Sequence, residues 1–283
     1  MISAPLPADT LTVDEKPQTG PRRLVCLMYH ELELPGRSLC QSEPGYVRYV
    51  VSATAFENQM RWLRSVGWRG MSMTEALSFP DQKGVVLTFD DGCETDLLAA
   101  APILKEAKFG ATFYITVGWV GKKGYLSHSQ LRELSDQEFD IGCHSMTHRY
   151  LSNLPDKQLH EEIAVAKTEL EQITGRRVEH FSCPGGRWSP SVVRAAKQAG
   201  YRSVATSRSL ANPRHTDPFS LGRLAVMRGT NLKDFQCLCE GHGRWKLQLR
   251  DLTLLSAKRL FGNSNYDRIR SLLLRTPRAN SNS

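Results

Sequence analysis

Two short motifs place side chains suited to metal binding and proton transfer at the ends of apolar segments. Asp90 and Asp91 follow the apolar run 85–89 and precede Gly92, which lets the chain turn sharply. One carboxylate of such a pair can bind a metal ion while the other faces a water molecule. An isolated Asp-Asp-Gly is more often a turn that caps the next helix, so the pair needs support from elsewhere in the chain.

That support comes from two histidines. His144 and His148 are four residues apart and directly follow the apolar segment 139–143. At this spacing both imidazoles can reach one ion. Alone, such a pair is more often exposed to solvent than bound to metal. Combined with one carboxylate of the Asp pair, it leaves open coordination positions for water and substrate, as a hydrolytic metal site requires.

Short apolar runs alternate with helical patterns along the chain, which is typical of βα units that build a parallel sheet. The predicted strands are Leu24–Tyr29, Val85–Phe89, Ala111–Ile115, Phe139–Cys143, His180–Cys183, Ser203–Ala205 and Leu224–Val226. Catalytic groups of such sheets collect at the carboxyl ends of the strands. We therefore expect one edge of the sheet to gather His30, Asp90, Asp91, His144 and Pro184–Arg187.

Three helices are predicted between these strands. One begins after Ser52 and ends at Gly67, and a second spans Leu159 to Ile173 and ends at Gly175. The third has Ser189 as its N-cap, Pro190 at its first position and Gly200 at its end.

The two motifs resemble those of the polysaccharide deacetylase family, also called the NodB homology domain or carbohydrate esterase family 4. Thr88–Gly92 looks like the family's T-F-D-D-G, and His144–His148 looks like its H-[ST]-x-x-H. The resemblance covers about 24–226. It implies an α/β fold, namely a distorted, TIM-like (β/α)7 barrel. It also implies a bound divalent ion, which is commonly zinc, with cobalt or nickel as alternatives.

Position by position, the resemblance makes Asp91, His144 and His148 the metal ligands. It makes Asp90 the general base that activates water at the ion. The leaving amine also needs a proton. Tyr29-His30 resembles a branch of the family in which an N-terminal histidine is the general acid, so His30 is the candidate, with a structural role as the alternative.

The sequence departs from the family at two later motifs. Where many members have R-x-P-x-G, with the arginine paired to the base, this chain has Ser182–Gly186. Arg187 could reach Asp90 or lie at the surface. The family's late Leu-x-His is replaced by Leu221–Leu224, which is why His30 matters.

The loop after the strand 180–183 is the candidate substrate and oxyanion site. A backbone N–H of this loop could stabilise the tetrahedral oxyanion. The candidate residues are Pro184, Gly185, Gly186, Arg187 and Trp188. Trp188 and Tyr125 could stack on a sugar ring or simply pack.

Three regions are predicted: a flexible tail over 1–23, the barrel over 24–235 and a basic helical extension over 236–283. The net charge is +8, but residues 241–283 carry nine of the 37 basic side chains and two of the 29 acidic ones. Interleaved with leucines, this charge fits a helix packed below the barrel or one in peripheral contact with an anionic membrane. Nucleic acid is not expected as a partner, because no binding motif accompanies the charge.

Seven cysteines without a C-x-x-C pair indicate reduced thiols. With no secretory signal or membrane span in the sequence, we expect a cytoplasmic protein, associated with the membrane surface if the basic extension binds there.

The expected function is metal-dependent removal of N-acetyl groups from a carbohydrate, an N-acetylhexosamine-containing glycan or its lipid-linked precursor. Two alternatives are hydrolysis of another small amide or ester, because the same groups serve any acyl transfer, and a catalytically impaired sugar-binding protein.

Overall fold

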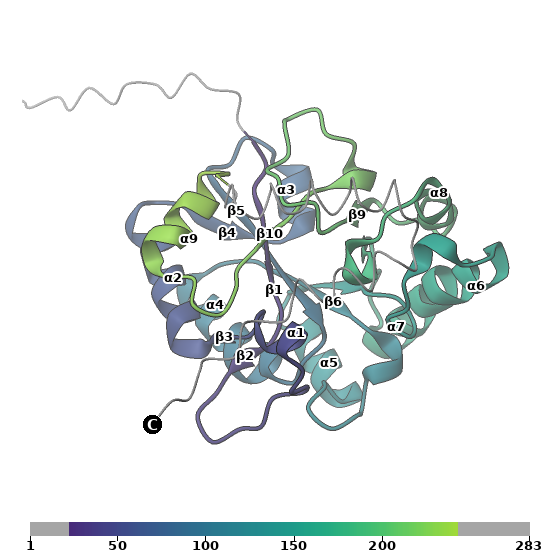
Figure 1. The fold of residues 1–283 in the computed structure, drawn as a ribbon, viewed down its shortest axis with the longest axis horizontal. Helices are drawn as coiled ribbons and strands as arrows, with labels where there is room; N and C mark the ends of the chain where they lie inside the picture. The colour runs from purple at the N-terminus through teal and green to yellow at the C-terminus, as the bar shows by residue number, and fades with distance from the viewer. Residues whose placement is uncertain (1–22, 243–283) are drawn as a thin grey trace, which may run out of the picture.

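The computed structural model describes residues 23–242 and shows a curved, parallel main sheet surrounded by helices (Figure 1). The strand order is β10-β1-β5-β6-β7-β8-β9, and β4 pairs with the beginning of β5. The bounds are β1 Cys26–Tyr29, β4 Arg69–Met71, β5 Gly84–Asp91, β6 Thr112–Ile115, β7 Asp140–Cys143, β8 His180–Ser182, β9 Ser203–Ala205 and β10 Leu224–Ala225. A separate small sheet pairs β2 (Leu32–Glu33) with β3 (Val51–Ser52).

All the strand segments predicted from the sequence are confirmed, with ends displaced by two residues at most. β5 is buried at every position from Val85 to Asp91, as expected for a parallel strand covered on both faces. β4 was not predicted, because Arg69–Met71 is short and has a central glycine.

The two edges of the sheet approach each other and nearly close a barrel. The segment just before β10 bridges to β9, where Leu221 N–H donates to the Val204 carbonyl at 3.0 Å and Leu221 is paired with Ala205. β10 itself pairs with β1. The predicted α/β distorted barrel is therefore confirmed.

Helices lie between successive strands and cover the outside of the sheet (Figure 1). The α-helices are α1 Pro44–Val47, α2 Ala53–Ser65, α3 Met73–Ser78, α4 Ala101–Ala107, α5 His128–Asp136, α6 Asp156–His160, α7 Ala166–Thr174, α8 Pro190–Gln198 and α9 Leu232–Cys239. Two π-helical turns span Asp96–Ala100 and Glu161–Val165, and 3-10 turns span Val117–Trp119, Leu151–Asn153, Pro184–Gly186 and Pro218–Ser220.

The predicted helix ends are confirmed by their capping contacts. The Ser52 hydroxyl accepts a hydrogen bond from Ala55 N–H, and the Ser189 hydroxyl accepts one from Val192 N–H. Gly175 ends α7 with a φ of 68°. The helix predicted over 159–173 is confirmed as part of a continuous helical run over 156–174, in which the π turn Glu161–Val165 lies between α6 and α7.

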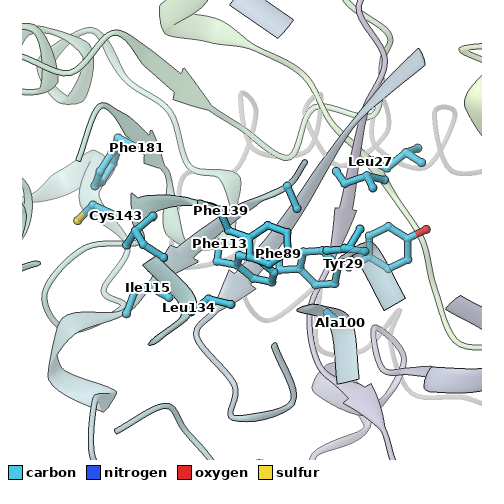
Figure 2. Close-up of a cluster of buried hydrophobic side chains, with 14 of the residues drawn as sticks. Leu27, Tyr29, Phe89, Ala100, Phe113, Ile115, Leu134, Phe139, Cys143 and Phe181 are labelled. Carbon is cyan, nitrogen blue, oxygen red and sulfur yellow. The ribbon is translucent and has the colours of Figure 1, made fainter. Parts of the chain in front are cut away.

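Stacked aromatic rings fix neighbouring strands against each other on the outer face of the sheet (Figure 2). Ring centroids are 5.2 Å apart between Tyr29 and Phe89 and 4.8 Å apart between Phe89 and Phe113. Phe139 meets Phe113 edge-on at 5.4 Å. Because side chains alternate along a strand, anchoring Phe89 outward turns Thr88 and Asp90 toward the barrel interior.

The described residues end near the predicted boundaries. Residues 1–22 and 243–283 lie outside them, so the tail and most of the basic extension are not described. α9 runs across the boundary predicted at residue 235, and its Phe235 packs edge-on against Trp62 of α2 at 5.9 Å. Between residues 23 and 242, no helix has the length and apolar character needed to cross a membrane.

Candidate functional site

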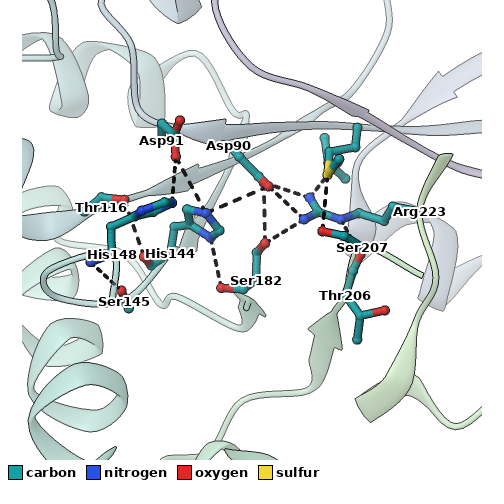
Figure 3. Close-up of polar contacts among 12 residues, drawn as sticks. Asp90, Asp91, Thr116, His144, Ser145, His148, Ser182, Thr206, Ser207 and Arg223 are labelled. Carbon is teal, nitrogen blue, oxygen red and sulfur yellow. Dashed lines mark hydrogen bonds and ion pairs between the residues drawn. The ribbon is translucent and has the colours of Figure 1, made fainter. Parts of the chain in front are cut away.

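The three predicted metal ligands meet at one point of the barrel rim. Asp91 ends β5, His144 directly follows β7, and His148 lies in the following loop. One ligand atom of each lies within 4.8 Å of the others. Asp91 Oδ1 is 3.4 Å from His148 Nε2 and 3.6 Å from His144 Nε2 (Figure 3).

The two turns that carry these ligands, at Asp91 and over His144–His148, have an unusual backbone conformation. Asp91, Ser145 and His148 have positive φ angles of 84°, 69° and 62°. Such conformations cost non-glycine residues about 1–3 kcal/mol each, and they persist only where the surroundings enforce them. The fold therefore holds the backbone of these turns in conformations that direct the ligand side chains toward one another.

Glu162 supplies part of that enforcement. This residue lies in the π turn Glu161–Val165 and is buried. Its carboxylate accepts hydrogen bonds from both the N–H (2.9 Å) and the hydroxyl of Thr147, and its carbonyl accepts one from Met146 N–H at 3.2 Å. The loop between His144 and His148 is thereby fastened to the helix behind it.

The chemistry of these groups fits a divalent cation. Asp91 Oδ1 is buried and has no hydrogen-bond partner among residues 23–242, which is costly unless a cation compensates it. His144 Nδ1 lies 2.9 Å from the Ser182 carbonyl oxygen, so this nitrogen carries the proton and donates. Its Nε2 is then left with a free lone pair for a metal, the arrangement common for histidine ligands.

Asp90 is held by an arginine that the sequence analysis did not assign. Arg223, which directly precedes β10, is 1% exposed and forms a two-pronged pair with Asp90, with Nη1 to Oδ1 at 2.7 Å and Nη2 to Oδ2 at 2.8 Å (Figure 3). Its other hydrogen bonds go to Thr88, Ser182 and Thr206. The family's usual arginine partner of the base is absent at the end of β8, and Arg223, just before the last strand, takes its place.

The two neighbouring carboxylates have opposite pKa shifts. Burial alone would raise the pKa of Asp90, but the charge and hydrogen bonds of Arg223 lower it below its ordinary value. Burial and the charge of Asp90 raise the pKa of Asp91 to about 8. Different surroundings thus separate the two groups, as in sites where two carboxyls have different tasks.

Arg187 does not lie at the surface, and its guanidinium lies 3.8 Å over the ring of Tyr150. The predicted alternative, that Arg187 pairs with Asp90, is replaced by the pair with Arg223. Trp188 is 41% exposed, and its Nε1–H donates to the Phe219 carbonyl.

The N–H groups of the loop after β8 are largely used within the loop. Gly186 N–H donates to Cys183, Arg187 N–H to Pro184 and Trp188 N–H to Gly186. Pro184 has no N–H, so Gly185 is the remaining candidate for an oxyanion donor in this loop. Gly185 is exposed and adopts a φ of 58°.

His30 follows β1, and its ring packs against that of Tyr49 at 4.8 Å between centroids. Its Nδ1 is buried and has no hydrogen-bond partner among the described residues. Burial lowers the pKa of His30 to about 4, although the charge of Asp90 opposes this shift. The charges of Asp90 and His148 both act on His30, so it lies within electrostatic reach of these site residues.

An aromatic pair adjoins the ligand His148. The Trp119 ring lies 4.8 Å from the imidazole of His148 and 4.9 Å from the ring of Tyr125, centroid to centroid. Trp119 was not singled out from the sequence, whereas Tyr125 was considered as a sugar platform. The contact with His148 connects Tyr125 to the site through Trp119.

The comparisons with known proteins agree with this geometry. A family model described as polysaccharide deacetylase matches residues 79–204. The poly-beta-1,6-N-acetyl-D-glucosamine N-deacetylase of Staphylococcus aureus is 31% identical over 199 residues, which cover 63% of this chain and 68% of the relative. The chain belongs to the polysaccharide deacetylase family and is an enzyme of that class, a hydrolase of carbon–nitrogen bonds.

Two further matches cover more of the chain. The Bacillus subtilis protein named "Putative polysaccharide deacetylase YxkH" is 28% identical over 226 residues, 78% of this chain and 77% of that relative. The solved structure of a polysaccharide deacetylase from Bacillus cereus has a TM-score of 0.67 at 25% identity and covers 77% of this chain and 69% of that one. The likeness therefore includes the strands on both sides of the site.

Proposed function

We propose that this deacetylase hydrolyses N-acetyl groups of a carbohydrate, with Asp90 as general base and a divalent ion held by Asp91, His144 and His148. The observation that carries the proposal is the contrast within the Asp pair. Asp90 is fixed and charge-balanced by Arg223, whereas Asp91 presents toward two imidazole nitrogens an oxygen that has no hydrogen-bond partner in the described part of the chain. Such a division of roles is what metal-assisted hydrolysis needs.

The ligand set of one carboxylate and two histidines suits zinc, and cobalt or nickel as alternatives. When bound, the ion would supply Lewis-acid chemistry, lowering the pKa of water and polarising the acetyl carbonyl. The chain positions the ligands. His144 is oriented by the Ser182 carbonyl, and His148 belongs to the loop that Glu162 fastens.

Asp90 accepts the proton of the attacking water in this proposal. Its lowered pKa keeps the carboxylate ionised throughout the neutral range, so it is always ready to accept. The paired guanidinium fixes the orientation of the carboxylate and shares its charge.

The leaving amine takes its proton from His30, and the carbonyl oxygen takes a hydrogen bond from Gly185 N–H. Because burial lowers the pKa of His30 to about 4, His30 must gain a proton during the reaction before it can act as the acid. The charge of Asp90 opposes the effect of burial and favours that protonated form. Support for Gly185 is that its neighbours' N–H groups are used inside the turn.

The substrate proposed is a glycan that contains N-acetylhexosamine. Relatives named for poly-beta-1,6-N-acetyl-D-glucosamine and for peptidoglycan N-acetylglucosamine support this class. The exposed Trp188 and the Trp119–Tyr125 pair offer faces on which a sugar ring can pack.

Acetate release from a panel of N-acetylated glycans, with and without chelator and added zinc, tests the proposal. Asp90→Asn should retain the ion and lose about 10²-fold or more in kcat, because it removes the base. His148→Ala should lose the ion itself. Full activity of Asp90→Asn would show that another group is the base.

The panel also separates the alternatives. Release of acetate from acetylated xylan or small amides, but from no N-acetyl sugar, would favour hydrolysis of another amide or ester. Stoichiometric metal binding without any acetate release would favour a sugar-binding protein.

A further inference from the structure

A second group of potential ligands lies beside the site and takes no part in the proposed reaction. Glu31 follows His30 between β1 and β2, Cys40 lies in the loop before α1, and Cys93 follows Asp91 by two residues. One carboxylate oxygen and the two Sγ atoms all lie within 4.8 Å of one another. Three separate segments of the chain thus bring two thiols and a carboxylate together.

The hydrogen-bond partners of Glu31 are all neutral. Its carboxylate, 2% exposed, accepts from Cys40 N–H at 3.0 and 3.2 Å and from the Tyr46 hydroxyl at 2.9 Å. No lysine, arginine or histidine of residues 23–242 forms an ion pair with it. Neutral hydrogen-bond donors therefore stabilise the Glu31 carboxylate, but no positive charge among residues 23–242 neutralises it.

Asp96 adds an independent sign that a cation belongs here. Its side chain is fully buried, and neither carboxylate oxygen has a hydrogen-bond partner within the described part of the chain. Burial and the negative charges of Asp91 and Glu31 raise the pKa of Asp96, which places its carboxylate within electrostatic reach of the cluster. An unpartnered buried carboxylate is unfavourable as a neutral group and more unfavourable when it is charged.

A disulfide between Cys40 and Cys93 would leave both of these carboxylates uncompensated. A divalent cation bound by the cluster balances Glu31 directly and, at longer range, makes a charge on Asp96 less unfavourable. Two thiolates and one carboxylate are ligands that zinc accepts in tetrahedral sites, with the fourth position open to water or another side chain. Cys40 is partly exposed and gives the ion a way in from solvent.

We propose that Glu31, Cys40 and Cys93 form a second, structural zinc site beside the catalytic one. Binding releases the protons of both thiols, which become thiolate ligands. The ion then ties the loop of Cys40 to the segment after Asp91 and to Glu31, next to His30. Its function is to fix the position of His30, the candidate acid, relative to Asp90 and Asp91.

Cobalt binding to the full 283-residue chain in the presence of a thiol-free reductant tests this proposal. Cobalt bound by thiolates gives a charge-transfer absorption in the near ultraviolet, which a site of Asp91, His144 and His148 cannot give because it has no sulfur. We expect this absorption, and about two ions bound per chain.

Matched cysteine variants locate the site. Cys40→Ser should remove the charge-transfer absorption and lower the stoichiometry from about two ions to about one. Cys237→Ser, at an exposed cysteine, should change neither. His148→Ala should keep the absorption while it loses the other ion and deacetylation, so failure of this proposal is distinguishable from failure of the proposed function.

Three results would overturn the inference. They are a wild-type chain that binds a single ion without the absorption, an absorption that survives in both Cys40→Ser and Cys93→Ser, and a Cys40–Cys93 disulfide whose reduced form binds no second ion. Circular dichroism of each variant confirms that it is folded before the ions are counted.

Discussion

Asp90 and Asp91 are adjacent in the chain, but their surroundings give them different electrostatic energies. Asp90 is balanced by Arg223, whereas Asp91 in the metal-free protein faces uncharged imidazoles and the charge of Asp90. Burial and this repulsion favour the protonated form of Asp91. The ionised Asp91 carboxylate that metal binding needs therefore destabilises the folded protein when no metal is bound.

Asp91→Asn should therefore stabilise the metal-free protein while it abolishes metal binding. Folded Asp91 has a pKa of about 8, whereas the ordinary value of an aspartate is 3.8, so the ionised unfolded state is increasingly favoured as pH rises between these values. The gain on substitution should be small near pH 4, grow toward pH 8 and then level off. We expect about 1–3 kcal/mol near neutral pH, or about 2–4 °C in Tm for each kcal/mol.

Thermal unfolding in chelator at several pH values measures this effect. Asparagine tolerates the positive φ of this position as aspartate does, so the backbone should not change. Asp136→Asn, at an exposed carboxylate, is the control and should leave Tm nearly unchanged. A lower Tm for Asp91→Asn would contradict the expectation.

The pair of Asp90 with Arg223 gives a second prediction for single residues. Arg223→Met leaves a buried carboxylate without its cation and should destabilise the protein by about 3–5 kcal/mol. Arg223→Lys keeps the charge but cannot form the two-pronged pair, so it should lower kcat/KM by about 10–100-fold. Denaturant unfolding and acetate release measure the two effects.

Two comparisons show whether the effect belongs to the pair. Asp90→Asn combined with Arg223→Met should be more stable than Arg223→Met alone, because no unpaired charge remains. Arg202→Lys, in the exposed pair with Glu179, should change stability by less than about 1 kcal/mol. Equal losses at Arg202 and Arg223 would contradict a special role for the buried pair.

At the level of elements, the π turn between α6 and α7 connects a helix to a metal ligand. The extra residue in such a turn shifts the helix so that Glu162 faces the loop of His148. The neighbouring Glu161 is exposed. The two adjacent glutamates therefore form a natural pair for comparison.

Glu162→Gln should weaken zinc binding at the catalytic site by about 10–100-fold, as loss of a supporting contact around metal ligands commonly does. The amide can accept only one of the two hydrogen bonds from Thr147, so the loop should loosen. Glu161→Gln should have no effect. Competition with a chelator gives the zinc affinity of each variant, and equal affinities would show that Glu162 does not hold the loop.

The sequence was sufficient for the strands and for the motif residues that follow them. The strands are buried apolar runs, and Asp90, Asp91 and His144 lie at their carboxyl ends, where the rule for parallel sheets places catalytic groups. Arg223 was missed because it precedes its strand and approaches Asp90 from the other end of the barrel. A lone arginine within an apolar strand segment is the signal that could have indicated it, since burial of arginine requires a partner.

Glu162 and Trp119 were missed for a different reason. Each acts through a contact between distant segments, Glu162 with Thr147 and Trp119 with His148. Neither belongs to a motif, and the periodicity that predicts the helix over 159–173 does not indicate the π turn within it. Only the packed arrangement of the loops reveals these contacts.

At the scale of the whole molecule, the basic residues 241–283 remain a prediction from sequence alone. Removing Gly241–Ser283 should weaken partition into anionic vesicles, because each Lys or Arg near such a surface contributes about 1 kcal/mol. Sedimentation with anionic and with neutral vesicles measures the loss. Unchanged partition into anionic vesicles would exclude the membrane contact.

The position of Arg223 also affects how the protein matures during synthesis. Both aspartates and both histidines of the rim precede the arginine by 75 residues or more along the chain. A nascent polypeptide thus exposes its whole ligand set before the guanidinium that orients the base has been translated. Asp90 therefore gains its orienting partner only after the segment that precedes the last strand has been made and has packed against it.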